Sequence, residues 1–436
     1  MTYEIYVHVP FCLRRCGYCD FVTFTGRDLG GGVSRASYAD MAIAEMRLTR
    51  DWQLAHGIEE PPASTVFFGG GTPTILPAAD LNRMLAAMRE LWGIEPGAEI
   101  TTEANPDTVD AAYIKELSDG GFTRISFGTQ SAVPHVLRTL DRTHTPANVE
   151  AGVRAAEAAG LRTSVDLIYG APRESLDDWR ASVRAAIDLG VNHISAYALT
   201  VEPTTKMGRR IADGTLPRPD DDDEAAKYEI ADELLSAAGL RWYEVSNWAR
   251  PGYESRHNLG YWRNVDWAGI GPGAHSHYNV VAVPSVILSE ASAESKDPRE
   301  RDSSALPQND RKAPHGDGSA LNAGLRAWDI AHPKLWGLKI SAGEVPWAGS
   351  ETVTRNEDLE EHVMLALRIR DGLDIPRLEE AAGTGIDRGE LRRMESEGLV
   401  DCVADNDGAI RRIVATRQGR LLNDMLIERF FDLLDL

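Results

Sequence analysis

Three cysteines near the N-terminus are the residues best suited to chemistry. Cys12, Cys16 and Cys19 follow the spacing C-x3-C-x2-C. Thiolates are the usual ligands of iron–sulfur clusters, and most such clusters take four of them. Three thiolates can hold three irons of a cubane and leave the fourth iron open, just as a catalytic zinc site keeps one position free. The triplet therefore predicts a catalytic cluster rather than an electron carrier.

Two other uses of these cysteines are less favoured. A zinc site needs a fourth Cys or His at finger-like spacing, and although His8 precedes the triplet, no second C-x2-C and no H-x3-H follows it. A disulfide framework is unexpected with four cysteines in 436 residues and no apolar signal segment at the start. Cys402 is isolated, and we expect it to be a small buried residue.

Composition indicates a globular protein of two or three folded units. Hydrophobic residues make up 43% of the chain. No apolar run approaches the roughly 18 residues of a membrane span. The net charge of -21 disfavours docking on nucleic acid or on an anionic membrane. We expect a cytoplasmic protein.

A parallel sheet is expected to position the cysteines. Short β-branched or aromatic runs alternate with helical patterns, which is typical of repeated βα units. The expected strands are residues 4–9, 64–68, 99–103, 124–128, 163–168 and 193–198, and the expected helices are 78–91, 110–119, 146–159 and 175–189. Six units in about 200 residues are too few for a complete eight-stranded barrel. The predicted fold class is α/β, with a partial (β/α)6 barrel.

Four segments are expected along the chain. Residues 1–216 form the partial barrel, and 217–283 form an extension that begins with a solvated acidic connector at 217–224. Residues 284–325 are rich in Ser, Glu, Asp, Lys and Pro, and we expect a disordered insertion there. Residues 326–436 form a smaller, mostly helical domain.

The C-terminal segment has the element order of a winged helix. Helices are expected at 358–369, 388–397 and 418–434, with a strand pair near Val400 and Ile410. A winged helix would suggest DNA binding. The 11 basic and 19 acidic residues from Glu357 onward disfavour that function.

Polar groups and glycines stand at or near the strand ends. Glycines expose N–H donors and let a ligand approach the backbone, although a glycine triplet is more often a turn. Each polar residue could equally be a cap, and an arginine is by default a surface charge. Together they are better explained by a ligand with an amine, a ribose and a carboxylate. The residues concerned are Gly69, Gly70, Gly71, Thr72, Glu103, Gln130, Arg142 and Asp166.

The cysteine run, with Tyr18 before its last cysteine, resembles that of radical S-adenosylmethionine enzymes. Four further runs narrow the resemblance to the oxygen-independent coproporphyrinogen III oxidase branch: Gly-Gly-Gly-Thr-Pro-Thr from Gly69, Glu-Ala-Asn-Pro from Glu103, Gly-Thr-Gln-Ser from Gly128 and Asp-Leu-Ile-Tyr-Gly from Asp166. The match covers nearly the whole chain except 284–325. It implies a [4Fe-4S] cluster on the cysteines, whose free iron binds S-adenosylmethionine and whose electron splits the sulfonium to give a deoxyadenosyl radical.

The resemblance also implies roles for single residues. Tyr6 and Tyr18 would flank the cofactor near the cluster, and Gly69 to Thr72 would line its methionine end. The contacts to its amine, carboxylate or ribose would come from Glu103, Gln130, Arg142 and Asp166. His8 could support the cluster or simply sit in its strand.

Two departures separate the chain from the oxidases. The oxidases continue C-x3-C-x2-C-x-C, whereas Asp20 and Phe21 follow Cys19 here. Their N-terminal extension is also missing, because the first strand begins by residue 4. Both features resemble the HemW group, which is similar to the oxidases but lacks decarboxylase activity and acts as a haem chaperone.

The pattern H-N-x-x-Y-W strengthens this resemblance, because HemW proteins associate it with haem handling. A neutral His257 can ligate haem iron, and the rings of Tyr261 and Trp262 offer flat surfaces to a porphyrin. From chemistry alone, a buried hydrogen-bond pair of His257 and Asn258 beside two core aromatics is the commoner arrangement. Downstream, other imidazoles near the same site, or only a tight turn, are expected at His275 and His277.

The leading expectation is a haem chaperone that carries a [4Fe-4S] cluster, binds S-adenosylmethionine and delivers haem to apoproteins such as respiratory enzymes. One alternative is an enzyme that uses the radical to oxidise coproporphyrinogen III or another substrate, with no catalytic residue assigned. A second alternative is a structural or regulatory cluster that controls homodimer formation or partner docking.

Overall fold

The computed structural model describes residues 2–279, 324–434 and 436, which form two compact units. The first unit contains Met1–Ala98 and Asp266–Arg355, and the second contains Glu99–Val265 and Asn356–Leu436. The expected domain boundaries at 216 and 326 do not coincide with this division. The expected insertion at 284–325 lies outside the described residues, except that its last two residues, Gly324 and Leu325, begin a strand.

The first unit is built on a mixed sheet with the strand order β14-β13-β12-β11-β1-β4. The central strand β1 (Tyr3–Val9) is buried at every position except Tyr6, as expected for a strand covered on both faces. It runs parallel to both neighbours, and the remaining pairs are antiparallel. The other strands are β4 (Ala63–Gly70), β11 (Asp266–Ile270), β12 (His275–Tyr278), β13 (Gly324–Asp329) and β14 (Trp347–Val353).

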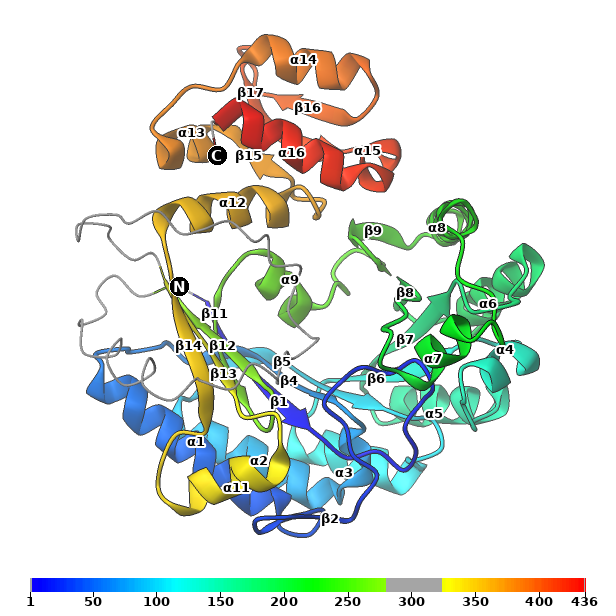
Figure 1. Cartoon of the computed structure of the whole chain (residues 1–436), viewed down its shortest axis with the longest axis vertical. Coiled ribbons are helices and arrows are strands. Elements are labelled where there is room, and N and C mark those ends of the chain that lie inside the picture. The colour runs from blue at the N-terminus through cyan, green and yellow to red at the C-terminus, as the bar shows by residue number, and fades with distance from the viewer. Residues whose placement is uncertain (1, 280–323, 435) are drawn as a thin grey trace. The chain divides into compact units, whose positions relative to one another are not determined.

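The described part of the first unit contains three α-helices, and two of them, α1 (Tyr38–Ala55) and α2 (Ala78–Leu91), pack side by side (Figure 1). The third is α11 (Pro333–Ser341). The helix α2 has the predicted bounds, whereas α1 was not predicted. Its inward face buries Glu45, Thr49 and Gln53 as well as apolar residues, so the apolar periodicity of its sequence is weak. The unit also holds the hairpin β2 (Asp28–Gly30) and β3 (Val33–Ser34) and the short 3-10 helix η1 (Pro73–Ile75).

The second unit contains the strand order β5-β6-β7-β8-β10-β9. From β5 to β8 the strands are parallel, and the last two are antiparallel. The strands β1 and β4 of the first unit and β5 to β8 of the second correspond to the six predicted strands, and within each unit they pair in parallel, so the α/β fold class is confirmed. The bounds are β5 (Ile94–Ala104), β6 (Arg124–Gln130), β7 (Arg162–Tyr169), β8 (His193–Ala198), β9 (Arg241–Glu244) and β10 (Asn247–Ala249).

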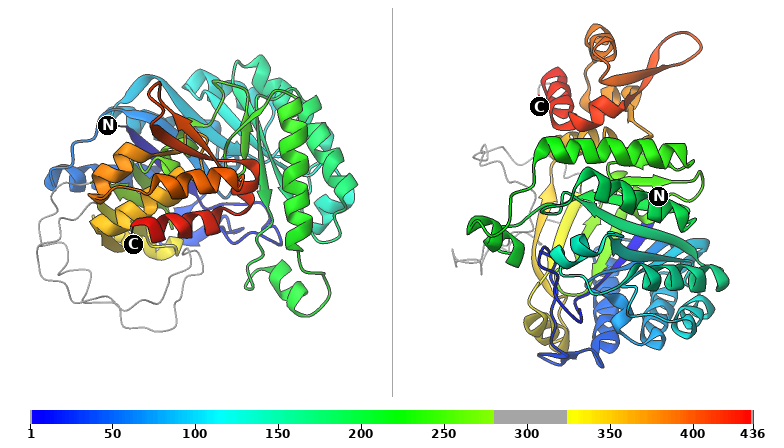
Figure 2. Two further views of the ribbon diagram at one scale, coloured as in Figure 1. Left: turned by 90° about the horizontal axis from the view of Figure 1, so that it is seen from above. Right: turned by 90° about the vertical axis from the view of Figure 1, so that its right-hand side faces the viewer.

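Helices connect the strands of the second unit, and three of them correspond to the helices predicted at 110–119, 146–159 and 175–189. The helices are α3 (Ala111–Gly120), α4 (Pro134–Thr139), α5 (Pro146–Ala158), α6 (Leu176–Asp188), α7 (Lys206–Ala212), α8 (Asp221–Ala237) and α9 (Arg256–Trp262). Both views in Figure 2 show α8 as a long helix, and it packs beside α6.

The prediction of a solvated connector at 217–224 is wrong for its last five residues. Asp220 caps α8 by accepting a hydrogen bond from the backbone of Asp223, and the following acidic residues fill the first helical turn. Carboxylates stabilise the positive end of the helix dipole by about 0.3–1 kcal/mol each. An acidic run therefore occurs both in the first turn of a helix and in a solvated loop, and its composition alone does not distinguish the two.

The C-terminal part of the second unit shows the predicted winged-helix order. Its sheet has the order β15-β17-β16. The predicted helix 418–434 is interrupted at Leu422, so it forms two helices. The elements are α12 (Arg355–Ala366), β15 (Leu373–Asp374), α13 (Ile375–Ala382), α14 (Arg388–Ser396), β16 (Val400–Ala404), β17 (Ile410–Ala415), α15 (Arg417–Leu421) and α16 (Asn423–Leu434).

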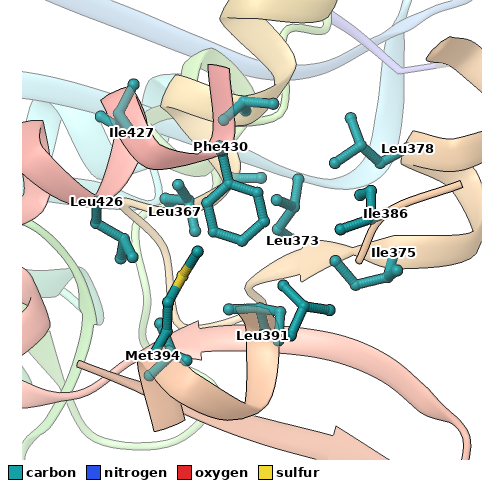
Figure 3. Packing of buried hydrophobic residues seen from close by; sticks show 14 of the residues in the cluster. Leu367, Leu373, Ile375, Leu378, Ile386, Leu391, Met394, Leu426, Ile427 and Phe430 are labelled. Atoms are coloured by element: carbon teal, nitrogen blue, oxygen red, sulfur yellow. The ribbon is translucent and has the colours of Figure 1, made fainter. Parts of the chain in front are cut away.

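An apolar core holds this part together (Figure 3). Phe430 of α16 is fully buried and points into a cluster that includes Leu367, Leu391 and Met394. Cys402 packs against the same cluster and its thiol donates to the carbonyl oxygen of Leu391 at 3.6 Å, but it is only partly buried, so the expected small buried residue is confirmed only in part.

Two buried carboxyl groups share a hydrogen bond in the first unit. Glu45 of α1 and Asp329 of β13 are 1% and 4% exposed. Glu45 also accepts from the backbone N–H of Gly271 at 2.7 Å and from the indole of Trp336 at 3.2 Å. Burial raises the pKa of Glu45 to about 7, and burial together with Glu45 raises the pKa of Asp329 well above its usual range.

These raised pKa values predict a loss of stability as the pH rises. The folded state binds more protons than the unfolded state, so stability should fall between about pH 5 and pH 8, and Glu45 alone should account for a loss on the order of 2 to 3 kcal/mol. Asp329→Asn keeps a donor to Glu45 but cannot ionise, so its free energy of unfolding should depend less on pH. Urea denaturation at several pH values measures the difference, with the exposed Asp51→Asn as the control. Parallel pH profiles for all three proteins would contradict the prediction.

Candidate functional site

The cysteine loop follows β1 and is closed by backbone hydrogen bonds. The N–H of Cys12 donates to Phe24 O at 3.0 Å, and the N–H of Cys19 donates to Cys16 O at 3.3 Å. Cys12 is buried, while the other two cysteines are partly buried. Burial raises the pKa of Cys19 to about 11, so binding of iron would have to promote its ionisation.

His8 supports this loop from its place in β1. Its Nε2 lies 2.9 Å from the carbonyl oxygen of Val22, and its Nδ1 lies 3.1 Å from the hydroxyl of Tyr6. A carbonyl only accepts, so Nε2 carries the proton and Tyr6 donates to Nδ1. A side chain at Gly70 would place its Cβ 2.5 Å from the ring. His8 therefore lies in the strand and holds the loop, while its support of a cluster stays a prediction.

The glycine run lies along the start of the cysteine loop. The N–H groups of Gly71 and Thr72 donate to Val9 O at 2.8 Å and to Phe11 O at 2.7 Å. The Thr72 hydroxyl lies 3.7 Å from the sulfur of Cys12. A Cβ at Gly71 would approach Phe11 O to 2.6 Å, so this close approach requires glycine.

Donors gather around Gly128 in the second unit. Gln130 ends β6 after a bulge, with φ of 61°, and its buried Oε1 has no hydrogen-bond partner among the described residues. The guanidinium of Arg142 donates to Asn105 Oδ1 at 2.6 Å and to Gly128 O at 2.7 Å. The Gln130 amide nitrogen and an Arg142 nitrogen lie 3.1 and 3.4 Å from the position of a Cβ at Gly128. Because Gly128 has no side chain, this arrangement fits a small anionic group such as a carboxylate.

Sequence reasoning missed Asn105, although it lies in the run Glu-Ala-Asn-Pro that carries the resemblance. Glu103 is partly buried near the end of β5. Asp166 lies within β7, and its carboxylate accepts from the hydroxyls of Ser195 at 2.7 Å and Ser126 at 3.0 Å. Burial raises the pKa of Asp166, and these two hydrogen bonds oppose that rise.

The H-N-x-x-Y-W motif forms the short helix α9. His257 is buried, which lowers its pKa to about 3, so the imidazole is neutral. Its Nε2 lies 2.9 Å from the hydroxyl of Tyr261. Asn258 donates to the hydroxyl of Tyr243 at 3.4 Å. These contacts differ from the expected pair of His257 with Asn258.

The segment that begins this helix contacts the middle of β5 and the first residues of β6 and β8. Glu99 of β5 accepts from the backbone N–H of Arg256 at 2.8 Å and of His257 at 3.3 Å. Arg124, the first residue of β6, donates to Tyr253 O at 3.1 Å. His193, the first residue of β8, lies 2.8 Å from the hydroxyl of Tyr243.

The H-N-x-x-Y-W motif and the donors around Gly128 therefore lie near opposite ends of β6. Arg124 and Gln130 are the first and last residues of β6. Six residue steps of a strand span about 20 Å. Only the donors around Gly128 belong to the carboxyl edge, where the sequence predicted an active face.

The downstream histidines belong to β12 of the first unit. The ring of His277 lies 4.9 Å from that of Trp267, and its Nε2 lies 3.3 Å from Asn279 Oδ1. His275 is exposed.

In the part of the chain that the structure describes, no group of three or more His, Cys, Asp or Glu side chains is arranged to hold one metal ion. No helix in the described ranges is long and apolar enough to cross a membrane.

The three-cysteine loop after the first strand of a partial (β/α)6 barrel, beside a glycine run, defines a radical S-adenosylmethionine protein. Residues 6–186 match the model of the Radical SAM superfamily. The fold is similar to that of the coproporphyrinogen III oxidase HemN from Escherichia coli, with a TM-score of 0.72 and 20% identity over 98% of this chain and 89% of that chain.

Curated relatives narrow the family. The chain is 38% identical to the haem chaperone HemW of Mycobacterium tuberculosis, over 98% of this chain and 94% of the relative. It is 27% identical to HemW of Bacillus subtilis over 98% of both chains. The chain therefore belongs to the HemW family of the radical SAM superfamily. That superfamily implies a [4Fe-4S] cluster and S-adenosylmethionine, which the three thiols and the donors around Gly128 fit.

Proposed function

We propose that this protein binds haem and passes it to apoproteins such as respiratory enzymes. The observation that carries the proposal is the match with HemW over nearly the whole chain, together with the H-N-x-x-Y-W helix. The oxidases have a cysteine two positions after the triplet, where this chain has Phe21. We also propose that the protein is cytoplasmic and forms a homodimer.

Three thiols would hold the cluster, and polar side chains near the strand ends would contact S-adenosylmethionine. The thiols of Cys12, Cys16 and Cys19 would hold three irons, and when bound the cluster supplies the electron that reduces the sulfonium. Arg142 and Gln130 would donate to the carboxylate of the cofactor, and Glu103 would accept from its amine. The remaining assigned contacts are those of Tyr6, Tyr18, Gly69, Gly70, Gly71, Thr72 and Asp166.

The H-N-x-x-Y-W helix would hold the haem. Its histidine is neutral, so one ring nitrogen has a free lone pair, and in the tautomer with the proton on Nδ1 that nitrogen is Nε2, which could then ligate iron. That nitrogen contacts Tyr261, so ligation by His257 requires the ring to leave this hydroxyl. Tyr261, Trp262 and Asn258 would then contact the porphyrin.

Haem retention and transfer test this proposal. Reduced, cluster-loaded protein should retain haem at micromolar concentrations through gel filtration and pass it to an apo-acceptor. His257→Ala should lower the haem affinity at least tenfold, because it removes the proposed ligand. His332→Ala, at an exposed histidine, is the matched control and should bind as the wild type does. If the wild-type protein retains no haem, the proposed function is wrong.

Radical oxidation of coproporphyrinogen III is the second candidate. The donors around Gly128 favour it, because a pure carrier has no obvious need for S-adenosylmethionine. Anaerobic incubation with dithionite, S-adenosylmethionine and coproporphyrinogen III decides by product mass. Decarboxylated product would support the second candidate, and its absence would remove the oxidase version.

A further inference from the structure

The first turn of the helix α9 contacts a buried ion pair that was not predicted from the sequence. Glu99 and Arg124 are 4% and 2% exposed, and the shortest distance between their charged atoms is 3.5 Å. Glu99 Oε1 also accepts from two N–H groups of the helix and lies 3.5 Å from the Ser255 hydroxyl. A buried carboxylate is stable only when charge and hydrogen bonds compensate its lost hydration. The first turn of the helix therefore supplies part of the compensation for Glu99.

The strand β5 also carries Glu103, the residue assigned to S-adenosylmethionine. Glu99 and Glu103 both belong to β5, and an even spacing places them on the same face of the strand. Four residue steps separate them by about 13 Å. Glu99 contacts the helix of the H-N-x-x-Y-W motif, whereas Glu103 is the proposed acceptor for the amine of S-adenosylmethionine.

We propose that Glu99 is a positioning residue for haem: it fixes the backbone of Arg256 and His257, so that the imidazole can exchange Tyr261 for iron without unwinding α9. This inference rests on the proposed function. It also places haem binding near Glu99, about 13 Å along β5 from Glu103, the proposed contact to S-adenosylmethionine. The two ligands should then respond to different residues of one strand.

The hydroxyl of Tyr243 supports the same helix from a second side. It lies 3.3 Å from the N–H of Ser255 and 3.4 Å from the amide of Asn258. Loss of the Glu99 contacts should therefore loosen the first turn of the helix without releasing the whole segment.

Three variants of the full chain, loaded with cluster, test the proposal. Glu99→Gln keeps an oxygen acceptor for the helix. Glu99→Leu combined with Arg124→Met removes both charges, so no unpaired buried charge prevents folding. Glu103→Gln alters the other end of the strand. Each is titrated with haem and, separately, with S-adenosylmethionine, and hydrogen exchange is followed at the amides of 255–262.

The expected result is a separation of the two ligands. The double variant should lose at least tenfold in haem affinity, shift the Soret band and exchange its 255–262 amides faster, with S-adenosylmethionine affinity within twofold of wild type. The haem affinity of Glu99→Gln should lie within about threefold of the wild-type value. Glu103→Gln should lose at least tenfold in S-adenosylmethionine affinity and keep the Soret band of the wild type.

Two outcomes would overturn the proposal. One is a double variant with unchanged haem affinity, Soret band and amide exchange. The other is an equal loss of both ligands, which would indicate general damage to the barrel. If the wild type itself binds no haem, the proposed function fails, and unchanged amide exchange in the double variant would then refute the positioning role separately.

Discussion

Replacing Cys12, Cys16 and Cys19 together by serine should reduce the iron bound after anaerobic reconstitution to less than about one-tenth of the wild-type amount. A serine hydroxyl does not ionise near neutral pH, so it cannot replace the thiolate ligands that a cluster requires. Iron and sulfide analysis, together with the visible absorbance of the cluster, measures the loss.

The fourth cysteine supplies the matched control. Cys402 packs against the C-terminal core, so Cys402→Ser should bind iron as the wild type does. Full iron content in the triple variant would contradict the cluster assignment. If the triple variant still binds haem but no longer transfers it or assembles, the cluster has the structural or regulatory role that the sequence left open.

Phe430→Ala should destabilise the C-terminal part by about 3–5 kcal/mol, because it removes a fully buried ring from the centre of a close-packed cluster. Hydrogen exchange at the amides of α12, α14 and α16 reports on this part of the chain. Those amides should exchange faster in the variant by a factor that corresponds to this loss.

An exposed residue of the adjoining helix provides the comparison. Leu421 is 38% exposed, so Leu421→Ala should change the exchange of the same amides far less. A loss below about 1 kcal/mol in Phe430→Ala would show that the neighbouring side chains fill the space. The cluster would then tolerate the loss of its central ring.

The strands and helices of the barrel could be predicted because each carries a local pattern. Strand 193–198 and helix 78–91 match the structure at both ends. Prediction failed where the local pattern is ambiguous. The acidic residues before α8 occur equally in a loop and in a first helical turn, and α1 turns polar residues such as Gln53 into the core.

Long-range pairing explains the remaining differences. Residues 326–353 were expected in a C-terminal domain, but β13 pairs with β12 and β14, and this sheet continues to β1. The bulge before Gln130 likewise depends on the pairing of β6 with β7. Neither partner strand can be identified from the residues of the strand itself.

The sequence by itself determined the cysteine triplet, the six parallel strands and the family, because spacing and periodicity are properties of neighbouring residues. Only the tertiary structure showed that His8 holds the cysteine loop, that His257 contacts Tyr261 and that Glu99 anchors α9, the helix that contains His257 and Tyr261. Glu99 and His257 are separated by 158 positions in the chain. Their contact depends on where β5 lies relative to α9, and no local pattern in the sequence encodes that position.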